Sequence, residues 1–347
     1  MFGHCSHSLN YISETLERFG VEFDPRPFAC LRSENEEDLF SYLVPPVHIN
    51  GLKEKQQAVY IVCKGGGKTA LCQWMAYKAL WQPDLTTIVV PVKIRELAAR
   101  FPLCSDYLSF CLQVSVCLFA AHYSKWSSLS FLFPANTSAE SSAYPPIFAL
   151  AKNKEAFYKW SEQLFGTSVA KWVAKNKVEE LLGFLSDLAP LSCPGGFWDT
   201  AKNVMGVLGC NLIVVFDDNL NYHDDSVAKM LAENWDMFAE QQVSTVALFS
   251  PRLFGLWDSF CKQTGAGKHT QITEIAWSKD LLREVLNERI TVATNGRVTS
   301  FSALPISEDP ATIEDEILSR SDSPRKCIVA AVQAMAHTAS CNSPRQL

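Results

Sequence analysis

The sequence predicts an α/β protein in which helices cover a five-stranded parallel sheet. Apolar runs rich in β-branched residues predict the strands, at residues 58–63, 86–92, 211–216, 243–249 and 270–275. Helical patterns alternate with these runs, at about residues 68–80, 226–241 and 251–262. Continuous apolar strands separated by helices are typical of a parallel sheet that is buried on both faces.

The predicted strands divide the chain into an N-terminal arm, a sheet domain and a helical lid with a C-terminal tail, at residues 1–50, 51–276 and 277–347. A largely helical insertion occupies about residues 93–210 of the sheet domain. Inside it we expect a loop at 125–146 and an amphipathic helix at 169–188.

The helical lid is predicted from capping signals. Ser278 can cap a helix that ends at Asn295-Gly296, and further helices follow at about 310–320 and 324–339. In the arm, the prolines between Phe23 and Phe28 predict a rigid extended segment.

The composition is that of a globular protein with a large core. The chain has 347 residues, of which 48% are hydrophobic and 20% are charged, and its net charge of -6 argues against broad nucleic-acid binding. Its 12 cysteines form no CxxC pair and fall mainly in apolar stretches, which favours a reducing cytoplasm. The longest apolar run, Tyr107 to Tyr123, contains Gln113 and predicts a buried helix rather than a membrane span. No signal-peptide pattern precedes it.

A glycine-rich stretch between the first strand and its helix predicts a phosphate-binding loop. Its glycines let successive backbone N–H groups surround an anion. Lys68 can reach the β- and γ-phosphates of a nucleotide, and the Thr69 hydroxyl can hold Mg²⁺. Val62 stands where the full pattern has glycine, and the alternative is an ordinary turn between a strand and a helix. The predicted nucleotide-binding residues are Lys64, Gly65, Gly66, Gly67, Lys68, Thr69 and Ala70.

An acidic pair ends the buried strand at 211–216. In a parallel sheet, a carboxylate at this position can hold Mg²⁺ through water, and we assign that role to Asp217. Asp218 is the candidate for polarising an attacking water molecule. Alone, such a pair is more often a cap or a turn.

Two arginines follow other predicted strand or helix boundaries. Arg252 follows the strand at 243–249 and could sense a γ-phosphate, whereas Arg325 opens the helix after Ser323-Pro324 and could reach bound phosphate from the lid. The alternative for Arg252 is an arginine at a loop-to-helix junction that pairs with a surface carboxylate, and the alternative for Arg325 is an arginine at a solvated helix end. With Lys68 and Asp218, these arginines complete the predicted catalytic set.

Three other stretches contain phosphate-loop or metal-ligand residue types. Gly265-Ala266-Gly267-Lys268 lacks a preceding strand and a following helix, so we interpret it as a turn. His4, Cys5 and His7 have no further ligand cluster, and we expect a mobile terminus rather than a metal site. His223 with Asp224 and Asp225 predicts a charged loop and a helix cap.

In its motif order the chain resembles the AAA+ and STAND branch of P-loop ATPases, and in particular a set of uncharacterised bacterial AAA-family ATPases. Phe23–Phe28, Gly65–Thr69 and Ser323–Arg325 carry this resemblance. It implies that Lys68 and Thr69 bind phosphate and Mg²⁺ and that Asp217 is the Walker B acid. It also implies that Arg252 lies in sensor 1 and Arg325 in sensor 2. The resemblance extends over roughly residues 50 to 340.

These observations favour an ATP-binding and ATP-hydrolysing conformational switch that uses Mg²⁺. We expect it to act through self-association or a partner protein and not to bind a membrane. Its relatives suggest bacterial signalling or defence. Oligomers of the group often share an arginine finger, for which Arg252, Arg289 and Arg320 are possible sources. One alternative is a nucleic-acid-loading ATPase of the origin-recognition type, which needs a basic face. Another is a nucleotide-binding scaffold with little turnover.

Overall fold

The computed structural model divides the chain into two compact units. It describes residues 3–29, 39–46, 57–81, 87–99, 104–123, 154–167, 170–171, 197–219, 225–306 and 309–342. The helical unit comprises residues 1–50, 63–70 and 275–347, and the sheet unit comprises residues 51–62 and 71–274. Most of the amphipathic helix predicted at 169–188, the loop at 125–146 and His223 lie outside the described residues.

The sheet has five parallel strands in the order β2-β3-β4-β1-β5. The strands are β1 (Gln57–Val62), β2 (Thr87–Lys93), β3 (Asn211–Asp217), β4 (Ser244–Phe249) and β5 (Gln271–Ile275). Each bound lies within one residue of its prediction, so the predicted five-stranded parallel sheet is confirmed. The central residues of β1, β2, β3 and β4 are buried because the apolar side chains point to both faces of a covered sheet, whereas the edge strand β5 is mostly exposed.

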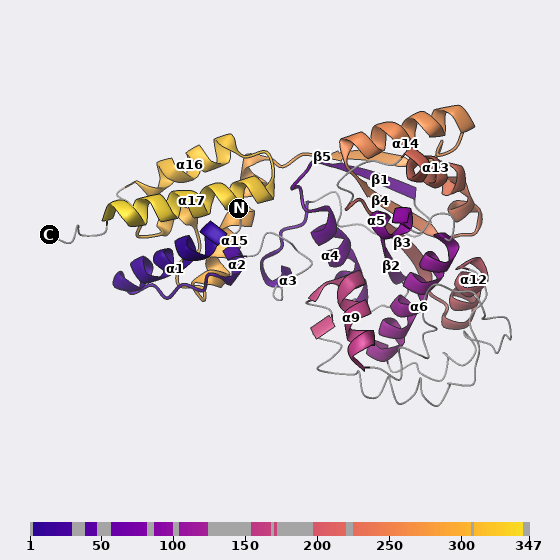
Figure 1. Cartoon of the computed structure of the whole chain (residues 1–347), viewed down its shortest axis with the longest axis horizontal. Helices are drawn as coiled ribbons and strands as arrows, with labels where there is room; N and C mark the ends of the chain where they lie inside the picture. The colour runs from indigo at the N-terminus through magenta and orange to yellow at the C-terminus, as the bar shows by residue number, and fades with distance from the viewer. Residues whose placement is uncertain are drawn as a thin grey trace. The chain divides into compact units, whose positions relative to one another are not determined.

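Helices cover both faces of the sheet. Figure 1 shows α13 and α14 on one side and α4 with α9 on the other, while α6 packs against edge strand β2. The backbone of Gly166, just after α9, lies against the Gln73 side chain of α4. The helices are α4 (Lys68–Trp81), α5 (Ile94–Ala99), α6 (Cys104–Tyr123), α9 (Lys154–Phe165), α12 (Phe197–Leu208), α13 (Asp225–Glu240) and α14 (Pro251–Thr264).

An aromatic cluster joins α13 and α14 to the sheet. The Trp235 ring lies 6.5 Å from that of Phe216 and 5.1 Å from that of Trp257, while the rings of Phe216 and Phe238 are 5.8 Å apart. All four side chains are buried. Burying one large apolar side chain contributes about 1.5–3 kcal/mol, so this cluster is a main source of stability for the sheet unit.

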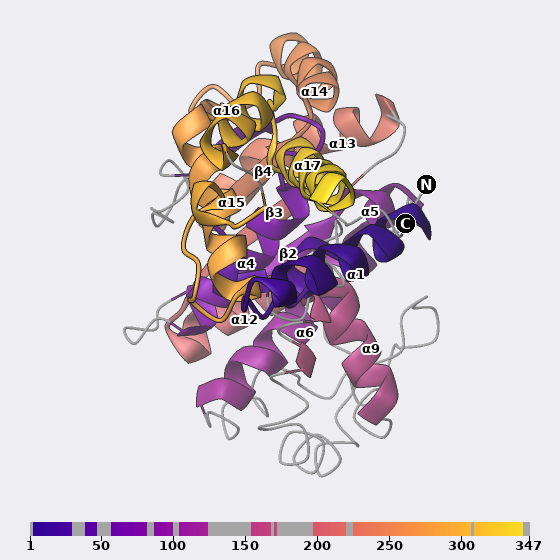
Figure 2. The ribbon, with the colours of Figure 1, turned by 90° about the vertical axis from the view of Figure 1, so that its left-hand side faces the viewer.

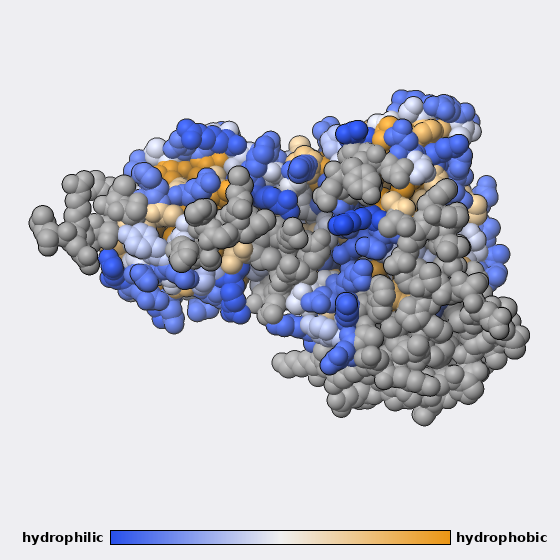
Figure 3. Space-filling view, viewed as in Figure 1, coloured by the Kyte–Doolittle hydropathy of each residue, from blue (hydrophilic) through white to orange (hydrophobic). Residues whose placement is uncertain are grey.

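The helical unit packs helices from both ends of the chain around one core. Its elements are α1 (Gly3–Arg18), α2 (Arg26–Ala29), α3 (Leu39–Tyr42), α15 (Lys279–Ala293), the 3₁₀ helix η4 (Phe301–Ala303), α16 (Pro310–Arg320) and α17 (Pro324–Asn342). Helices α1 and α17 lie side by side (Figures 1 and 2), and the Tyr11 hydroxyl donates to the Ala339 carbonyl at 3.3 Å. Figure 3 shows hydrophobic surface over α16 and α17, and partly buried Ile313 and Ala330 border this core.

The beginning of the chain differs from its prediction. Helix α1 occupies the expected mobile terminus because Leu9, Ile12 and Leu16 form an apolar stripe that enters the core of the helical unit. The segment predicted as extended contains the short helix α2, and the rings of Phe23 and Phe28 stack at 5.8 Å inside the same core.

The predicted capping signals of the helical unit are confirmed. The Ser278 hydroxyl accepts the Leu281 N–H at 3.2 Å, and the left-handed residues Asn295 and Gly296 follow the end of α15. Helix α16 has its predicted bounds, and α17 extends the predicted helix to Asn342. The Gly265–Lys268 stretch is a turn after α14, as predicted.

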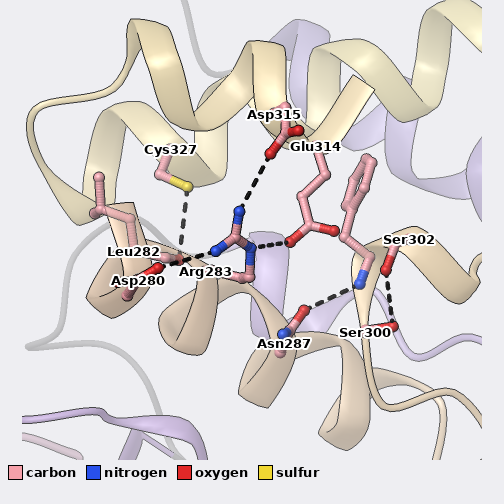
Figure 4. Close-up of polar contacts among 10 residues, drawn as sticks. Asp280, Leu282, Arg283, Asn287, Ser300, Ser302, Glu314, Asp315 and Cys327 are labelled. Atoms are coloured by element: carbon pink, nitrogen blue, oxygen red, sulfur yellow. Dashed lines mark hydrogen bonds and ion pairs between the residues drawn. The ribbon is translucent and has the colours of Figure 1, made fainter. Parts of the chain in front are cut away.

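A charged cluster ties α15 to α16 (Figure 4). The Arg283 guanidinium donates to Glu314 at 3.0 Å, to Asp315 at 3.2 Å and to Asp280 at 3.0 Å. The Glu314 side chain is only 5% exposed, so Arg283 supplies the counter-charge of a buried carboxylate.

Helix α6 covers the longest apolar run of the sequence, and most of its described side chains are buried. Among the described helices, none is long and apolar enough to span a bilayer.

Candidate functional site

The glycine loop is a tight turn directly after β1. Gly65 and Gly67 have φ angles of 84° and 82°, in the left-handed region where a side chain costs about 1–2 kcal/mol. The Gly66 N–H donates to the Cys63 carbonyl at 3.0 Å. Left-handed residues alternating with others form the kind of backbone nest in which several N–H groups can face one anion.

The polar side chains predicted for phosphate and Mg²⁺ remain available at this loop. Lys64 is exposed, and Lys68 and Thr69 are half-buried at the start of α4. Within the described part of the chain, no hydrogen bond or ion pair engages Lys68 or Thr69. Ala70 is buried against Leu39 and Tyr42, which fixes the start of α4 in the helical unit.

The first turn of α17 contacts the glycine loop. The Arg325 N–H donates to the Gly65 carbonyl at 3.4 Å, and the Cys63 thiol donates to the Asp322 carbonyl at 3.8 Å. A Cβ on Gly65 would lie 3.2 Å from the Arg325 Cβ and 3.3 Å from the Ser323 Oγ. The structure therefore brings together two predicted site segments, the glycine loop and Ser323–Arg325, that are far apart in the sequence.

Asp217 ends β3 on the face of the sheet where α4 lies. Phe216 packs against Trp235 and Phe238 of α13, so its neighbour Asp217 points to the opposite face. Asp217 is 1% exposed. Burial raises the pKa of the Cys72 thiol in α4 well above its usual range, and the nearby Asp217 charge raises that pKa further. Within the sheet unit, the predicted Mg²⁺ carboxylate thus lies close to Cys72 of α4.

Asp218 has a structural contact that its predicted role does not include. Its Oδ2 accepts the Ser250 N–H at 2.8 Å, and its own N–H donates to the Leu248 carbonyl at 3.2 Å. The Ser250 hydroxyl in turn caps α14 by accepting the Leu253 N–H. Asp218 therefore holds the turn from β4 into α14, where the side chain of Arg252 is exposed.

The three candidate arginine fingers occupy different environments. Arg289 is 7% exposed, donates to the Pro27 carbonyl and lies 4.5 Å from the centre of the Tyr42 ring. The suggestion that Arg289 reaches a neighbouring subunit is therefore wrong. Its position could have excluded it, because Arg289 shares the buried face of α15 with Leu282, Val285 and Leu286. Arg252 and Arg320 are exposed.

Sequence reasoning missed Lys93, the last residue of β2. It pairs in register with Asp217, and its charge lowers the pKa of Cys72, which burial and Asp217 raise. The available signal was a lysine directly after an apolar run.

The donor set fits a magnesium ion in kind, because a carboxylate and a hydroxyl supply the oxygen ligands that Mg²⁺ prefers. Among the described residues, no group of three or more His, Cys, Asp or Glu side chains could hold a metal by itself.

The fold is a mixed α/β fold of the Rossmann-like or P-loop kind, with an all-parallel sheet. Comparisons of the chain with protein-family models, curated proteins and solved structures find no match.

Proposed function

We propose that this protein is an ATP-binding and ATP-hydrolysing conformational switch of the AAA+ and STAND type. The observation that carries the proposal is the contact between the glycine loop at Gly65 and the first turn of α17 at Ser323–Arg325. An ordinary turn between a strand and a helix needs neither two left-handed glycines nor a contact with a helix whose first turn carries an arginine. A loop that binds phosphate and reports it to a lid uses both.

The sheet order supports the same proposal. Strand β4 lies between β1, which leads into the loop, and β3, which carries Asp217. The residues that follow β4, including Ser250 and Arg252, therefore begin between the carboxyl ends of β1 and β3. Within the sheet unit, Asp217 lies near Cys72 of α4, because its charge raises the pKa of that thiol.

The roles of the residues follow from their chemistry. The loop amides and Lys68 bind the phosphates, and the Thr69 hydroxyl with Asp217 holds Mg²⁺, which neutralises phosphate charge when it is bound. Arg325 approaches the phosphates from α17. Asp218 orients the attacking water with its second oxygen, while its Oδ2 holds Ser250.

The output of the switch is a change in self-association or in binding to a partner protein. Because α17 contacts the loop backbone directly, nucleotide occupancy can change the first turn of that helix. The net charge of -6 disfavours nucleic acid as the partner.

The test is retention of labelled ATP at saturating Mg²⁺. Lys68→Ala should weaken binding at least about tenfold, since a charged phosphate contact is worth about 1.5–3 kcal/mol. The matched control is Lys268→Ala, which removes a lysine from the Gly-Lys turn after α14 and should leave binding unchanged. Light scattering with and without ATP then reports the oligomeric mass. If the parent protein retains no ATP, or if Lys68→Ala binds as the parent does, the proposal is wrong.

One observation favours a second candidate, a nucleotide-binding scaffold with little turnover. The Asp218 side chain, 3% exposed, already bonds to the Ser250 backbone and so has a structural reason to be present. Measuring ATP turnover in the parent and in Asp218→Asn separates the two functions. If both bind ATP and neither turns it over, even with partners present, the scaffold function is correct.

A further inference from the structure

Two helices of this chain begin with the same Ser-Pro-Arg sequence, and they differ in how their first turn is capped. The serine before α14 is Ser250, and the serine before α17 is Ser323. The Ser250 hydroxyl accepts the N–H of the third residue after it, Leu253, at 3.3 Å. Side chains cap α15 and α16 with the same spacing. The sequence therefore predicts the same cap for α17, from the Ser323 hydroxyl to the Lys326 N–H.

The structure does not make this cap. Ser323 is in the capping position, because its carbonyl accepts the Cys327 N–H at 3.0 Å. It is completely buried, and its hydroxyl helps the Lys326 ammonium to lower the pKa of the Asp322 carboxyl, but it makes no hydrogen bond of normal geometry with any described residue. The Lys326 N–H also has no acceptor among the residues that the structure describes. Buried polar groups are normally paired, so this donor and this acceptor form an unmade pair.

The glycine loop binds the first turn of α17 instead. The Gly65 carbonyl accepts the Arg325 N–H at 3.4 Å. The Gly66 N–H belongs to the same planar trans peptide unit as that carbonyl and points in the opposite direction, and it donates to the Cys63 carbonyl at 3.0 Å. One peptide unit therefore holds both the turn inside the loop and the contact with the helix.

We propose that Ser323 is the alternative cap of α17, and that it forms its bond when phosphate in the glycine loop rotates the Gly65–Gly66 peptide. The proposal rests on the proposed function, in which the loop amides bind phosphate. For the Gly66 N–H to face a phosphate, it must leave the Cys63 carbonyl, and the Gly65 carbonyl then turns away from α17. Glycine on both sides of the peptide makes this rotation sterically easy. The released first turn is then capped by Ser323, as α14 is capped by Ser250.

The experiment measures hydrogen exchange of single backbone amides by NMR, with and without ATP at saturating Mg²⁺. ATP should slow exchange of the Lys326 N–H at least about fivefold, the factor that a serine cap typically contributes. Ser323→Ala should abolish this gain, whereas the matched control Ser250→Ala should keep it. If ATP is retained and the Lys326 N–H exchanges as before, or if the gain survives in Ser323→Ala, the proposal is wrong.

The same variants without ATP test the unmade cap and do not depend on nucleotide binding. Ser323→Ala should leave exchange of the Lys326 N–H within about twofold of the parent, because its hydroxyl bonds to no described group. Ser250→Ala should speed exchange of the Leu253 N–H at least about fivefold. Equal effects at the two helices would show that Ser323 already caps α17, and would overturn the inference whether or not ATP binds.

A third comparison releases α17 without nucleotide. A Cβ on Gly65 would lie 3.2 Å from the Arg325 Cβ, whereas the nearest atom to a Cβ on Gly67 is 3.9 Å away. Gly65→Ala should therefore protect the Lys326 N–H at least about fivefold, and Gly67→Ala should not. Adding Ser323→Ala to Gly65→Ala should remove that protection, and circular dichroism checks that each variant is folded. Protection that persists in the double variant would mean that another group caps the released helix, which contradicts the proposal.

Discussion

Placing a methyl group on Gly65 tests the contact between the glycine loop and α17. Gly65, Gly67 and Gly20 all lie in the helical unit and all have positive φ, at 84°, 82° and 75°. They differ in the space around a new Cβ. At Gly65 it would lie 3.2 Å from the Arg325 Cβ, at Gly67 the nearest atom is 3.9 Å away, and at Gly20 nothing lies within 4 Å.

These differences set the expected magnitudes. An alanine in the left-handed region costs about 1–2 kcal/mol, and this is the whole cost for Gly20→Ala and Gly67→Ala. Gly65→Ala also forces a contact with a Cβ held by helix backbone, which adds about 1–2 kcal/mol at the lower end of overpacking costs. Its total should therefore be about 2–4 kcal/mol.

Urea unfolding followed by circular dichroism measures all three variants. The midpoints should fall for Gly20→Ala and Gly67→Ala by similar amounts and for Gly65→Ala by clearly more, with unchanged slopes. The difference between Gly65→Ala and Gly67→Ala isolates the contact with α17, since both variants have the same backbone strain. If these two variants unfold at the same urea concentration, α17 does not lie against the loop, and the observation behind the proposed function is lost.

Three further predictions use other contacts. Arg283→Ala should cost about 2 kcal/mol by leaving Glu314 buried without its counter-charge. Lys262→Ala removes an exposed ion pair and should cost less than about 0.5 kcal/mol, so equal urea midpoints for the two variants would contradict this prediction. Asp218→Ala should cost about 1–3 kcal/mol by removing the acceptor of the Ser250 N–H, and Asp218→Asn should cost less because it keeps an oxygen; thermal unfolding compares the two variants, and equal losses would argue against that bond. Burial raises the pKa of Cys327 from 9.0 to about 11, so the unfolded thiol loses its proton first and stability should fall between these pH values. Urea unfolding at several pH values should show a smaller loss of stability with rising pH for Cys327→Ala than for the parent protein. An equal loss in both proteins would refute this assignment.

Local features of the structure could be predicted because they depend on nearby residues. Every strand is found within one residue of its expected bounds, and the cap at Ser278 and the left-handed pair Asn295-Gly296 end a helix as their chemistry requires. The glycine loop is also where its sequence places it. What it binds stays a prediction, together with the roles of Lys68, Thr69, Asp217 and Arg325.

Errors arose where burial depends on distant partners. Helix α1 is apolar on one side, but only its packing against α17 and α2 gives that stripe a core to enter. For Arg289 the helical pattern already indicated burial, and the tertiary structure adds its contacts with Pro27 and Tyr42.

By itself, the sequence determined the strands, many of the helices and the glycine turn, because side-chain periodicity and backbone sterics act over a few residues. Only the tertiary structure decided that α17 reaches Gly65, that Asp218 holds Ser250 and that Lys93 stands beside Asp217. These neighbours are set by strand order and helix packing, which join residues that no local pattern connects.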